Sequence, residues 1–332
     1  MNKSKDAFEN GMQASPSFEG EGATLRKVGA KKILGMKKSH FFFYLSIVAF
    51  PILQFLVFYV YVNLNSFVLS FQKYDFGAGK FVWNGINNFK DIFLDFGRDE
   101  SMRASVKNSL ILFVLNLIFS NFGTIVFSYY IYKNHVGSKA FKVILYAPHI
   151  ISTLIVVVMY KEFVEVVIPA IWLELFDKEI YPLLSMSELS KYITVLFFSI
   201  WVGLGTQVLV YSGTMSSISD SVIESAKLDG ITPVKELFLI IIPLIWPTTI
   251  TFLLSALAGI FTNQMHLFSF FGDNADPGLQ TFGYLLYARV QKSVSMAEYP
   301  YLSALGLLMT CIAAPITLLV RRALEKYGPS TN

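Results

Sequence analysis

Long apolar runs alternate with polar segments along this chain. A helix needs about 20 consecutive apolar residues to cross the hydrocarbon core of a bilayer. Six runs come close to this length, at about 41–62, 108–131, 143–160, 192–211, 237–263 and 301–320. The pattern therefore predicts six transmembrane helices. Pro243 and Pro247 lie at the start of the fifth run, where we expect a cytosolic segment to bend into the membrane.

The composition agrees with a membrane protein. Of the 332 residues, 54% are hydrophobic and only 15% are charged, whereas about a quarter of the residues in a soluble globular protein are charged. The net charge of +4 is small and unevenly distributed, so it indicates membrane topology and not nucleic-acid binding. The single cysteine, Cys311, excludes an intramolecular disulfide. We expect an all-α membrane protein.

The lysine and arginine residues predict the orientation of the spans. With the amino terminus in the cytosol, the cytosolic segments hold 16 of the 27 basic residues and carry a net charge of +7, whereas the outer segments carry −3. Because cytosolic loops are enriched in basic residues, both termini are expected in the cytosol, with 63–107, 164–191 and 267–300 outside. Within 63–107, a turn is predicted at 75–79 and an amphipathic stretch at 88–96.

Three regions follow: a cytosolic basic tail at 1–40, a transmembrane domain at 41–322 and a cytosolic tail at 323–332. The first apolar run lacks a cleavage site of small residues, so we expect it to remain as an anchor. The basic stretch 26–38 beside it is typical of a topology signal that contacts lipid headgroups. Binding of a partner protein is the alternative for this stretch.

The six runs contain no Asp, Glu, Lys or Arg, and only His149 interrupts them. Ionisable groups inside a membrane are costly and normally mark proton relays or ion pathways. Their absence argues against a proton-coupled carrier, a voltage sensor or an intramembrane hydrolase, and it predicts that a partner supplies the energy for transport. His149 is interpreted as a hydrogen-bonded structural residue.

Nothing in the sequence predicts an enzyme. The other histidines, His40, His135 and His266, have no metal-ligand spacing. The glycine- and lysine-rich segment 29–37 lacks the Gly-Lys-Ser/Thr ending of a phosphate loop. We therefore expect no catalytic residues, no metal and no cofactor on this chain.

The polar segment after the fourth run, 217–233, has the pattern of two short helices joined by a turn. Asp220 or Ser221 is expected to cap the first helix, and Ser221 with Glu224 has the spacing of a capping box. Asp229-Gly230 is expected to end this helix, because glycine adopts the left-handed conformation of a C-cap.

A second helix is expected to begin after Thr232, as its cap, with Pro233 at the first helical position. Both helices show apolar residues at helical spacing. The predicted apolar faces are Ile218, Val222 and Ala226 on the first helix and Val234, Leu237, Phe238 and Ile241 on the second.

The same segment, at about 217–243, carries a spaced motif. The motif consists of Glu224-Ser225-Ala226, Gly230, Ile240 and Ile242-Pro243. It resembles the EAA loop of bacterial ABC importer permeases. Two positions depart from the usual pattern, since Ser225 stands where the family usually has alanine and Ile242 where it usually has leucine.

The resemblance extends over nearly the whole chain. Similarity to the carbohydrate-uptake permeases of the maltose and lactose type lies in 85–89 (Gly-Ile-Asn-Asn-Phe), Pro148, 301–306 (Tyr-Leu-Ser-Ala-Leu-Gly) and Arg321-Arg322. The resemblance implies the type I permease fold of ABC importers, with six transmembrane helices in the bacterial plasma membrane. It also implies a heterodimer with a second permease, two cytosolic ATPase subunits that hold ATP and Mg, and an extracytoplasmic solute-binding protein.

In this family the EAA segment docks into a groove of the ATPase subunit. The residues of this chain that match it, or that shape its turn, are Glu224, Ser225, Ala226, Asp229, Gly230 and Pro243. The resemblance implies that Glu224 is the polar anchor of the contact and that Gly230 allows the loop to lie flat.

The charge-free runs agree with transport of a neutral solute, and the resemblance implies a sugar, in particular an oligosaccharide. A non-sugar solute and a stand-alone secondary carrier remain as alternatives. Uncharged polar groups in the fourth and fifth runs are the candidates for the substrate pathway: Trp201, Gly203, Gln207, Asn263 and Gln264. The alternative for the polar side chains is ordinary hydrogen bonding between helices, which is the interpretation of Thr206.

Overall fold

The computed structural model describes residues 38–329, and side chains from Phe42 onward. Most of the predicted tail 1–40 lies outside the described residues. The chain divides into two units, Met1–Asn65 and Ser66–Asn332. The described part of the first unit is helical and continues into the second: α2 (Lys38–Gln54), η1 (Phe55–Tyr61, a π-helix) and α3 (Val62–Leu69). The helical stretch Phe42–Leu69 is long enough to span a membrane, and it extends beyond the predicted end at residue 62.

In the second unit, α3 is followed by a hairpin of β1 (Gln72–Asp75) and β2 (Lys80–Trp83), which pair antiparallel with Gln72 opposite Trp83. The side chain of Asp75 accepts hydrogen bonds from the backbone amides of Gly77 and Ala78. This contact forms the turn predicted at 75–79. The amphipathic stretch predicted at 88–96 is α4 (Asn87–Arg98).

Three long helices cross the second unit without a break: α5 (Glu100–Tyr132), α10 (Glu188–Ser216) and α17 (Glu298–Tyr327). Each contains one predicted apolar run and extends past it into polar residues. Two of the helices start at side-chain caps, because Asp99 accepts from the Met102 amide and Ser187 from the Ser190 amide. The predicted spans 108–131, 192–211 and 301–320 are thus confirmed as helices.

The predicted third span, 143–160, is not one straight helix. The chain forms α6 (Ser138–Ile150), bends by 109°, and continues as α7 (Thr153–Glu162), η2 (Phe163–Val167) and α8 (Ile168–Phe176). Ile151 is extended, with φ −89° and ψ 148°. Pro148 cannot donate a helical hydrogen bond, and the β-branched residues that follow it lose side-chain freedom in a helix. Both features favour a break at this point.

The predicted fifth span, 237–263, also bends. Here α12 (Pro233–Glu236), η3 (Leu237–Ile241) and α13 (Ile242–Leu244) meet α14 (Trp246–Ala258) at 72°. The bend lies at Ile245, between Pro243 and Pro247, as the two prolines predicted. The described residues contain four helices that are long and apolar enough to cross a membrane, and six spans if each bent pair counts as one. This count agrees with the six predicted runs.

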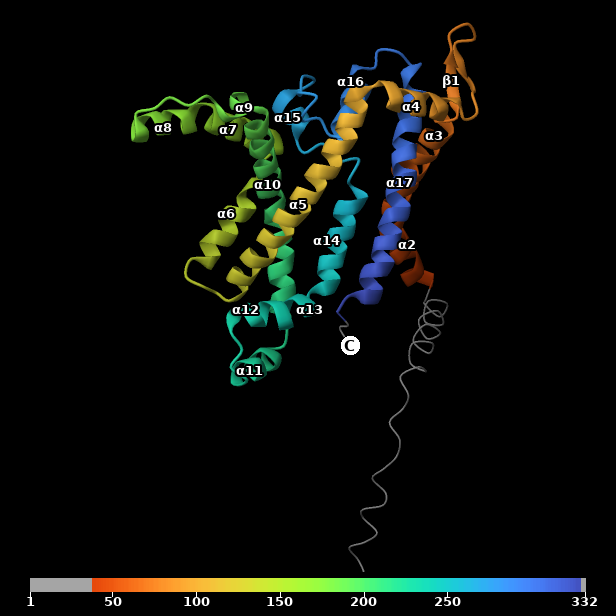
Figure 1. The fold of residues 1–332 in the computed structure, drawn as a ribbon. Helices are drawn as coiled ribbons and strands as arrows, with labels where there is room; N and C mark the ends of the chain where they lie inside the picture. The colour runs from red at the N-terminus through yellow and green to blue at the C-terminus, as the bar shows by residue number, and fades with distance from the viewer. Residues whose placement is uncertain (1–37, 330–332) are drawn as a thin grey trace, which may run out of the picture. The chain divides into compact units, whose positions relative to one another are not determined.

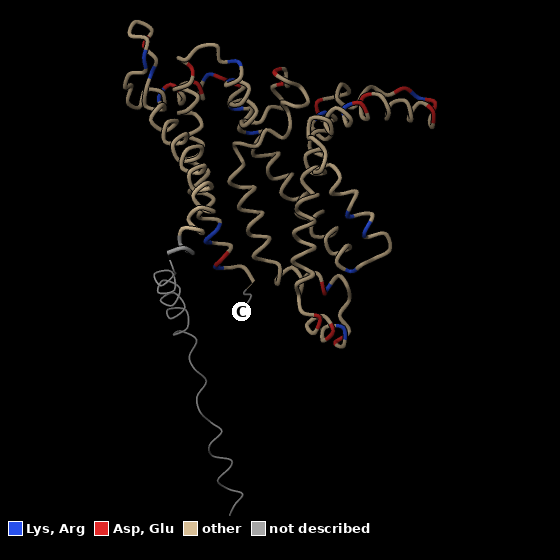
Figure 2. Tube along the Cα trace, turned by 180° about the vertical axis from the view of Figure 1, so that it is seen from behind, with Lys and Arg blue, Asp and Glu red and all other residues tan. Residues whose placement is uncertain are grey.

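The short helices of the second unit lie at its two ends (Figure 1). At one end are the hairpin, α4, α7, α8, α9 (Leu183–Met186), α15 (Leu267–Phe271) and α16 (Phe282–Lys292). At the opposite end are α12, α13 and α11 (Asp220–Leu228). Most charged residues of this unit lie toward these ends, and the middle of each long helix, α5, α10 and α17, is free of charge (Figure 2). This distribution agrees with the predicted assignment of loops to two sides.

The core of the second unit is built around α10. Its inner side chains include Phe198 and Val208, which are fully buried, and they pack against α5, α6 and α15. Gly205 permits the contact with α6, because a Cβ atom at this position would lie 2.7 Å from the carbonyl oxygen of Leu145. The close approach of α10 to α5 and α6 places the polar side chains of these helices near one another.

Candidate functional site

The first candidate site is α11 and the turn after it. Ser219, and not Asp220 or Ser221, is the N-cap residue of α11, and its hydroxyl lies 2.8 Å from that of Ser221. Among the hydrogen bonds of the described residues, the capping box predicted for Ser221 and Glu224 is not formed. The predicted start was therefore wrong by one or two residues. Asp220 lies in the first turn, where its charge interacts favourably with the helix dipole.

The predicted end of α11 is confirmed. Gly230 is left-handed, with φ 72°, and its amide donates to the carbonyl of Lys227 at 3.0 Å. The amide of Ile231 donates to the carbonyl of Ala226 at 3.2 Å. These two bonds form a Schellman motif, which satisfies the last carbonyls of the helix. The predicted start of the second helix is confirmed too, with Thr232 as the N-cap and Pro233 at the first position.

The predicted apolar faces of the two short helices are partly wrong. On α11 the buried residues are Ile223 and Ala226, whereas Val222 is 43% exposed. Beyond α12 the buried residues are Leu237, Ile241 and Ile245, whereas Val234 and Phe238 are exposed. Of these, Ile223, Leu237, Ile241 and Ile245 form one cluster with Tyr211 and Met215 at the end of α10. Spacing alone allowed either set, and the contact with α10 selects the buried one.

The outer face of α11 is exposed in the described part of the chain. Of the six residues predicted for coupling, four are exposed, namely Glu224, Ser225, Asp229 and Gly230. Leu228 on the same face is 90% exposed. The other two predicted residues are not on this face, because Ala226 is buried beneath it and Pro243 is half-buried at the bend before α14.

The second candidate site is a polar cavity of about 430 Å³ between the helices of the second unit. It brings together three of the five residues predicted for the pathway: Gly203, Gln207 and Asn263. The complete wall consists of Asn116, Ser120, Pro148, His149, Thr153, Ser199, Val202, Gly203, Gln207, Ala256, Asn263, Met265 and His266. These residues offer hydroxyl, amide and imidazole groups, and none of them is Asp, Glu, Lys or Arg.

Trp201 and Gln264, also predicted for the pathway, do not line this cavity. Trp201 lies in a separate apolar pocket of about 540 Å³, with Tyr160 and Phe197 among its neighbours. Its ring centroid is 6.3 Å from that of Tyr160 and 6.2 Å from that of Phe198. Trp201 therefore packs among aromatic side chains and not in the polar cavity.

Gln207 and Asn263 are held by polar contacts of their own. The side-chain oxygen of Gln207 accepts hydrogen bonds from Ser120 at 3.1 Å and from Thr124 at 3.0 Å, which joins α10 to α5. The side-chain oxygen of Asn263 accepts from the Met265 amide at 2.8 Å. Both side chains thus have a structural role as well as a place in the cavity wall. Thr206, expected to bond between helices, has a buried hydroxyl with no partner among the described residues.

The sequence interpretation missed two histidines in the wall. His149 was interpreted as structural, yet it is exposed and lines the cavity beside the buried Pro148. His266 follows Met265, and both have positive φ in the irregular segment after α14. Burial holds the pKa of His266 below its usual 6.5, so the imidazole is neutral at pH 7. Pro148, next to His149 and shortly before the break that follows α6, was the sequence signal that could have predicted the position of His149 in the cavity wall.

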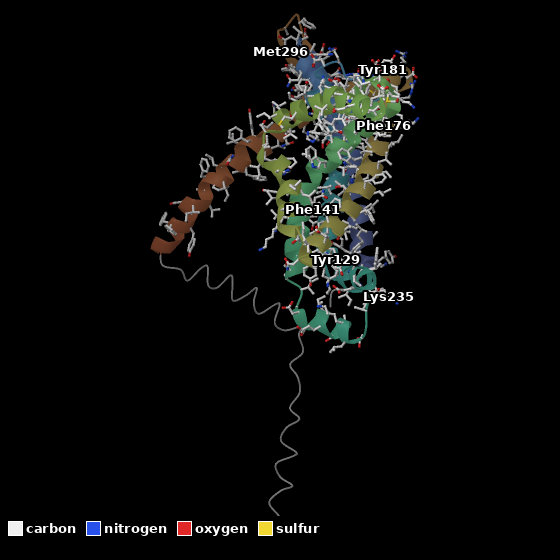
Figure 3. The ribbon with its side chains drawn as sticks, turned by 90° about the vertical axis from the view of Figure 1, so that its left-hand side faces the viewer. Tyr129, Phe141, Phe176, Tyr181, Lys235 and Met296 are labelled. Atoms are coloured by element: carbon white, nitrogen blue, oxygen red, sulfur yellow. The ribbon has the colours of Figure 1, made fainter. Side chains whose placement is uncertain are left out.

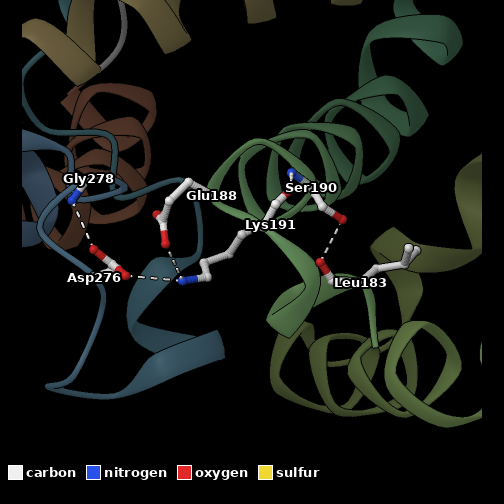
Figure 4. Close-up of polar contacts among 7 residues, drawn as sticks. Leu183, Glu188, Ser190, Lys191, Asp276 and Gly278 are labelled. Atoms are coloured by element: carbon white, nitrogen blue, oxygen red, sulfur yellow. Dashed lines mark hydrogen bonds and ion pairs between the residues drawn. The ribbon is translucent and has the colours of Figure 1, made fainter. Parts of the chain in front are cut away.

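A polar network holds the loop that contains Asp276 and Gly278 (Figure 4). Lys191 donates to Glu188 and to Asp276, each at 3.1 Å. The hydrogen bond from Lys191 lowers the pKa of the Asp276 carboxyl below its ordinary 3.8. Asn108 on α5 donates to the carbonyls of Gly278 at 2.9 Å and Gln280 at 3.1 Å. This loop leads to Thr281, whose hydroxyl donates to the Asn263 carbonyl at 2.9 Å, so the network orients one wall of the cavity.

Comparison with known proteins decides the family. Residues 41–331 match the family model described as the binding-protein-dependent transport system inner membrane component. The chain belongs to this family. It is a permease subunit of a binding-protein-dependent ABC importer and a component of the inner membrane, as the EAA pattern predicted. A comparison with curated proteins gave no match.

Solved structures with the same fold include chains of bacterial ABC transporters. One, described as a bacterial ABC transporter involved in the import of the acidic polysaccharide alginate, has a TM-score of 0.73 at 22% identity, over 88% of this chain and 97% of that one. Another is the bacterial alginate ABC transporter in complex with alginate pentasaccharide-bound periplasmic protein, with a TM-score of 0.70 at 20% identity, over 87% of this chain and 96% of that one. The predicted type I permease fold is confirmed.

Proposed function

We propose that this permease subunit forms, together with a second permease, the pathway of an oligosaccharide across the membrane. The observation that carries the proposal is the cavity around Gly203, Gln207 and Asn263, whose wall is polar but contains no Asp, Glu, Lys or Arg. Hydroxyl and amide groups suit a sugar, because each can exchange hydrogen bonds with sugar hydroxyls without burying a charge. The two similar solved transporters, whose descriptions name alginate and its pentasaccharide, support a carbohydrate.

A second permease completes the pathway in this proposal. His149 and Asn263 line the cavity, yet both are exposed in the single chain. A pathway for a solute requires walls on all sides within the membrane, so another protein surface is needed to cover these residues. The solute-binding protein then delivers the sugar to the outer end, and both termini lie in the cytosol.

The exposed face of α11 is the proposed contact with a cytosolic ATPase subunit. Four predicted residues are available on this face, and Gly230 with its Schellman motif fixes the direction in which the chain leaves it. Glu224 supplies a charge and Leu228 an apolar side chain to the partner. ATP and Mg are bound and used by the two ATPase subunits, and this chain has no catalytic residues of its own.

Filling the cavity tests the pathway directly. A Cβ atom at Gly203 would meet nothing within 4 Å, so Gly203→Leu is expected to project into the cavity without disturbing the packing of α10. In the complete reconstituted complex, we expect this variant to lose uptake while ATPase subunits still co-purify. Gly213→Leu is the matched control, because Gly213 is also on α10 and also faces open space, but lies outside the cavity wall. Normal uptake by Gly203→Leu would contradict the proposal.

A further inference from the structure

Glu236 is a buried charge in the helix that follows α11. Its residue exposure is 3%, and among the described residues it is the only charged residue in the buried class. Its carboxylate oxygen lies 2.5 Å from the Nζ atom of Lys133. Lys133 is the C-cap residue of α5, and Glu236 is the last residue of α12. The ion pair therefore joins the end of a membrane-spanning helix to the α11–α12 segment.

A second contact joins the same two elements. The hydroxyl of Tyr129 on α5 donates to the carbonyl of Pro233 at 3.1 Å. The Lys133 ammonium also lies 5.4 Å from the ring centroid of Tyr129 and 5.5 Å from that of Tyr132, within the range of cation–π interactions. Tyr129 and Lys235, the neighbour of Glu236, are labelled near the same end of the molecule in Figure 3. The last turn of α5 thus holds both the first and the last residue of α12.

Stability alone does not explain an ion pair at this position. Apolar side chains of similar volume often serve as well as a buried ion pair or better, whereas removing one partner leaves an uncompensated charge. A close ion pair differs from apolar packing because separating its two charges leaves the buried Glu236 carboxylate uncompensated. Such a contact restricts how α12 can slide or rotate on the end of α5.

α5 connects this ion pair to the polar cavity. Ser120 and Thr124 on α5 donate to Gln207, and Asn116 and Ser120 line the cavity wall. Ser120 is nine residues before Tyr129, a separation of roughly 14 Å along a straight α-helix. α5 is one unbroken helix over this distance. A displacement of its last turn therefore moves the polar groups that hold Gln207.

We propose that Lys133 and Glu236 are positioning residues that transmit movement of the α11–α12 segment to α5 and so to the cavity. When an ATPase subunit displaces α11, the ion pair makes the last turn of α5 follow. This inference rests on the proposed coupling function of α11. It assigns no contact with the ATPase subunit or with the sugar to either residue.

The test uses the complete complex reconstituted in vesicles, with uptake and ATP hydrolysis measured together. We expect Glu236→Gln and Lys133→Met to retain the ATPase subunits, because the exposed face of α11 is unchanged. Uptake per ATP hydrolysed is expected to fall about fivefold or more, which is the lower end of typical coupling between sites. The double variant should be no worse than either single variant, because all three lack the same pair.

Two further variants make the result decisive. Glu325→Gln is the control, since Glu325 pairs with Arg321 at the surface, where the two side chains are 50% and 57% exposed. This variant should keep the normal ratio of uptake to hydrolysis. The reversed pair Lys133→Glu with Glu236→Lys should recover assembly and most of the ratio, even if the single variants fail to assemble.

A normal ratio in both single variants would overturn the proposal. So would a reversed pair that assembles but does not recover the ratio, because the pair would then serve folding alone. Failure of the underlying coupling function gives a different result: Glu224→Lys would then retain both the ATPase subunits and uptake. If Glu224→Lys loses the ATPase subunits while Glu236→Gln behaves normally, only the role of the ion pair is wrong.

Discussion

The two candidate sites differ in how the chain builds them. The coupling segment is continuous in sequence, and its turn is made by hydrogen bonds between residues at most five positions apart. The cavity wall combines residues from α5, α6, α7, α10, α14 and the segment after α14. A change in the first site should therefore act locally on one partner contact, whereas a change in the second should act on the solute while the contact with ATPase subunits survives.

Reversal of charge on α11 is expected to have the largest effect. Glu224→Lys places a wrong charge at the proposed contact, and breaking a buried charge contact costs on the order of 3–5 kcal/mol. We expect normal insertion into the membrane, loss of co-purified ATPase subunits and loss of uptake. Glu325→Lys, a charge reversal elsewhere on the chain, should retain both. Retention of the ATPase subunits by Glu224→Lys would remove the distinction between the two sites.

The second largest effect is expected in the turn after α11. Gly230 has φ 72°, and a left-handed conformation costs an L-residue with a side chain roughly 1–2 kcal/mol. Gly230→Val adds a β-branched side chain there and is expected to weaken ATPase co-purification severalfold. Gly230→Asn is the matched variant, because asparagine tolerates this conformation, and it should remain close to normal. Equal behaviour of the two variants would show that the left-handed turn is unimportant.

A moderate effect is expected at Asn263. Asn263→Ala removes an amide from the cavity wall together with the hydrogen bond to the Met265 amide. Uptake should fall or the preference among oligosaccharides should change, while ATPase association and basal hydrolysis continue. Uptake measured with a panel of labelled oligosaccharides checks this outcome. Loss of assembly, or unchanged uptake of every sugar, would return Asn263 to a purely structural role.

The smallest effect is expected in the polar network of Lys191 and Asp276. The pKa of Asp276 is lowered in the folded protein, so its ion pair with Lys191 contributes stability above pH 3.8, and this contribution is lost as the pH falls through the folded pKa. Because Asp276 is 38% exposed and ion pairs near the surface contribute about 0–1 kcal/mol, Asp276→Asn should lower the thermal unfolding temperature slightly at pH 6. The difference between variant and parent should shrink as the pH is lowered below 3.8. A difference that stays constant with pH would exclude the ionised pair as its cause.

Local signals in the sequence predicted the turns and the spans well. Gly230 and its neighbours were enough to predict the end of α11. The two prolines around Ile245 were enough to predict the second bend. The buried face of α11 could not be predicted in the same way, since Val222 and Ile223 are equally apolar and only the contact with Tyr211 and Met215 distinguishes them.

Long-range contacts decide which of the candidate residues lie together in the cavity wall. Gly203, Gln207 and Asn263 were grouped as candidates because they lie in the two runs that flank the coupling loop. Trp201, only two residues before Gly203, faces the apolar pocket instead. His149 enters the cavity because α6 breaks after Ile150. The ion pair of Glu236 joins residues 103 positions apart. No local pattern in the sequence predicts Lys133 as its partner.

The central claim is that the exposed face of α11 contacts an ATPase subunit from the cytosolic side. Cross-linking tests it most directly, using single cysteines introduced after replacement of Cys311 by serine. Leu228→Cys lies on this face and should cross-link to the ATPase subunit in the assembled complex, and it should resist a membrane-impermeant thiol reagent in sealed cells. Ala78→Cys, in the β1–β2 turn, should react with that reagent and form no such cross-link. External labelling of Leu228→Cys, or a cross-link to the ATPase subunit from Ala78→Cys alone, would contradict the account.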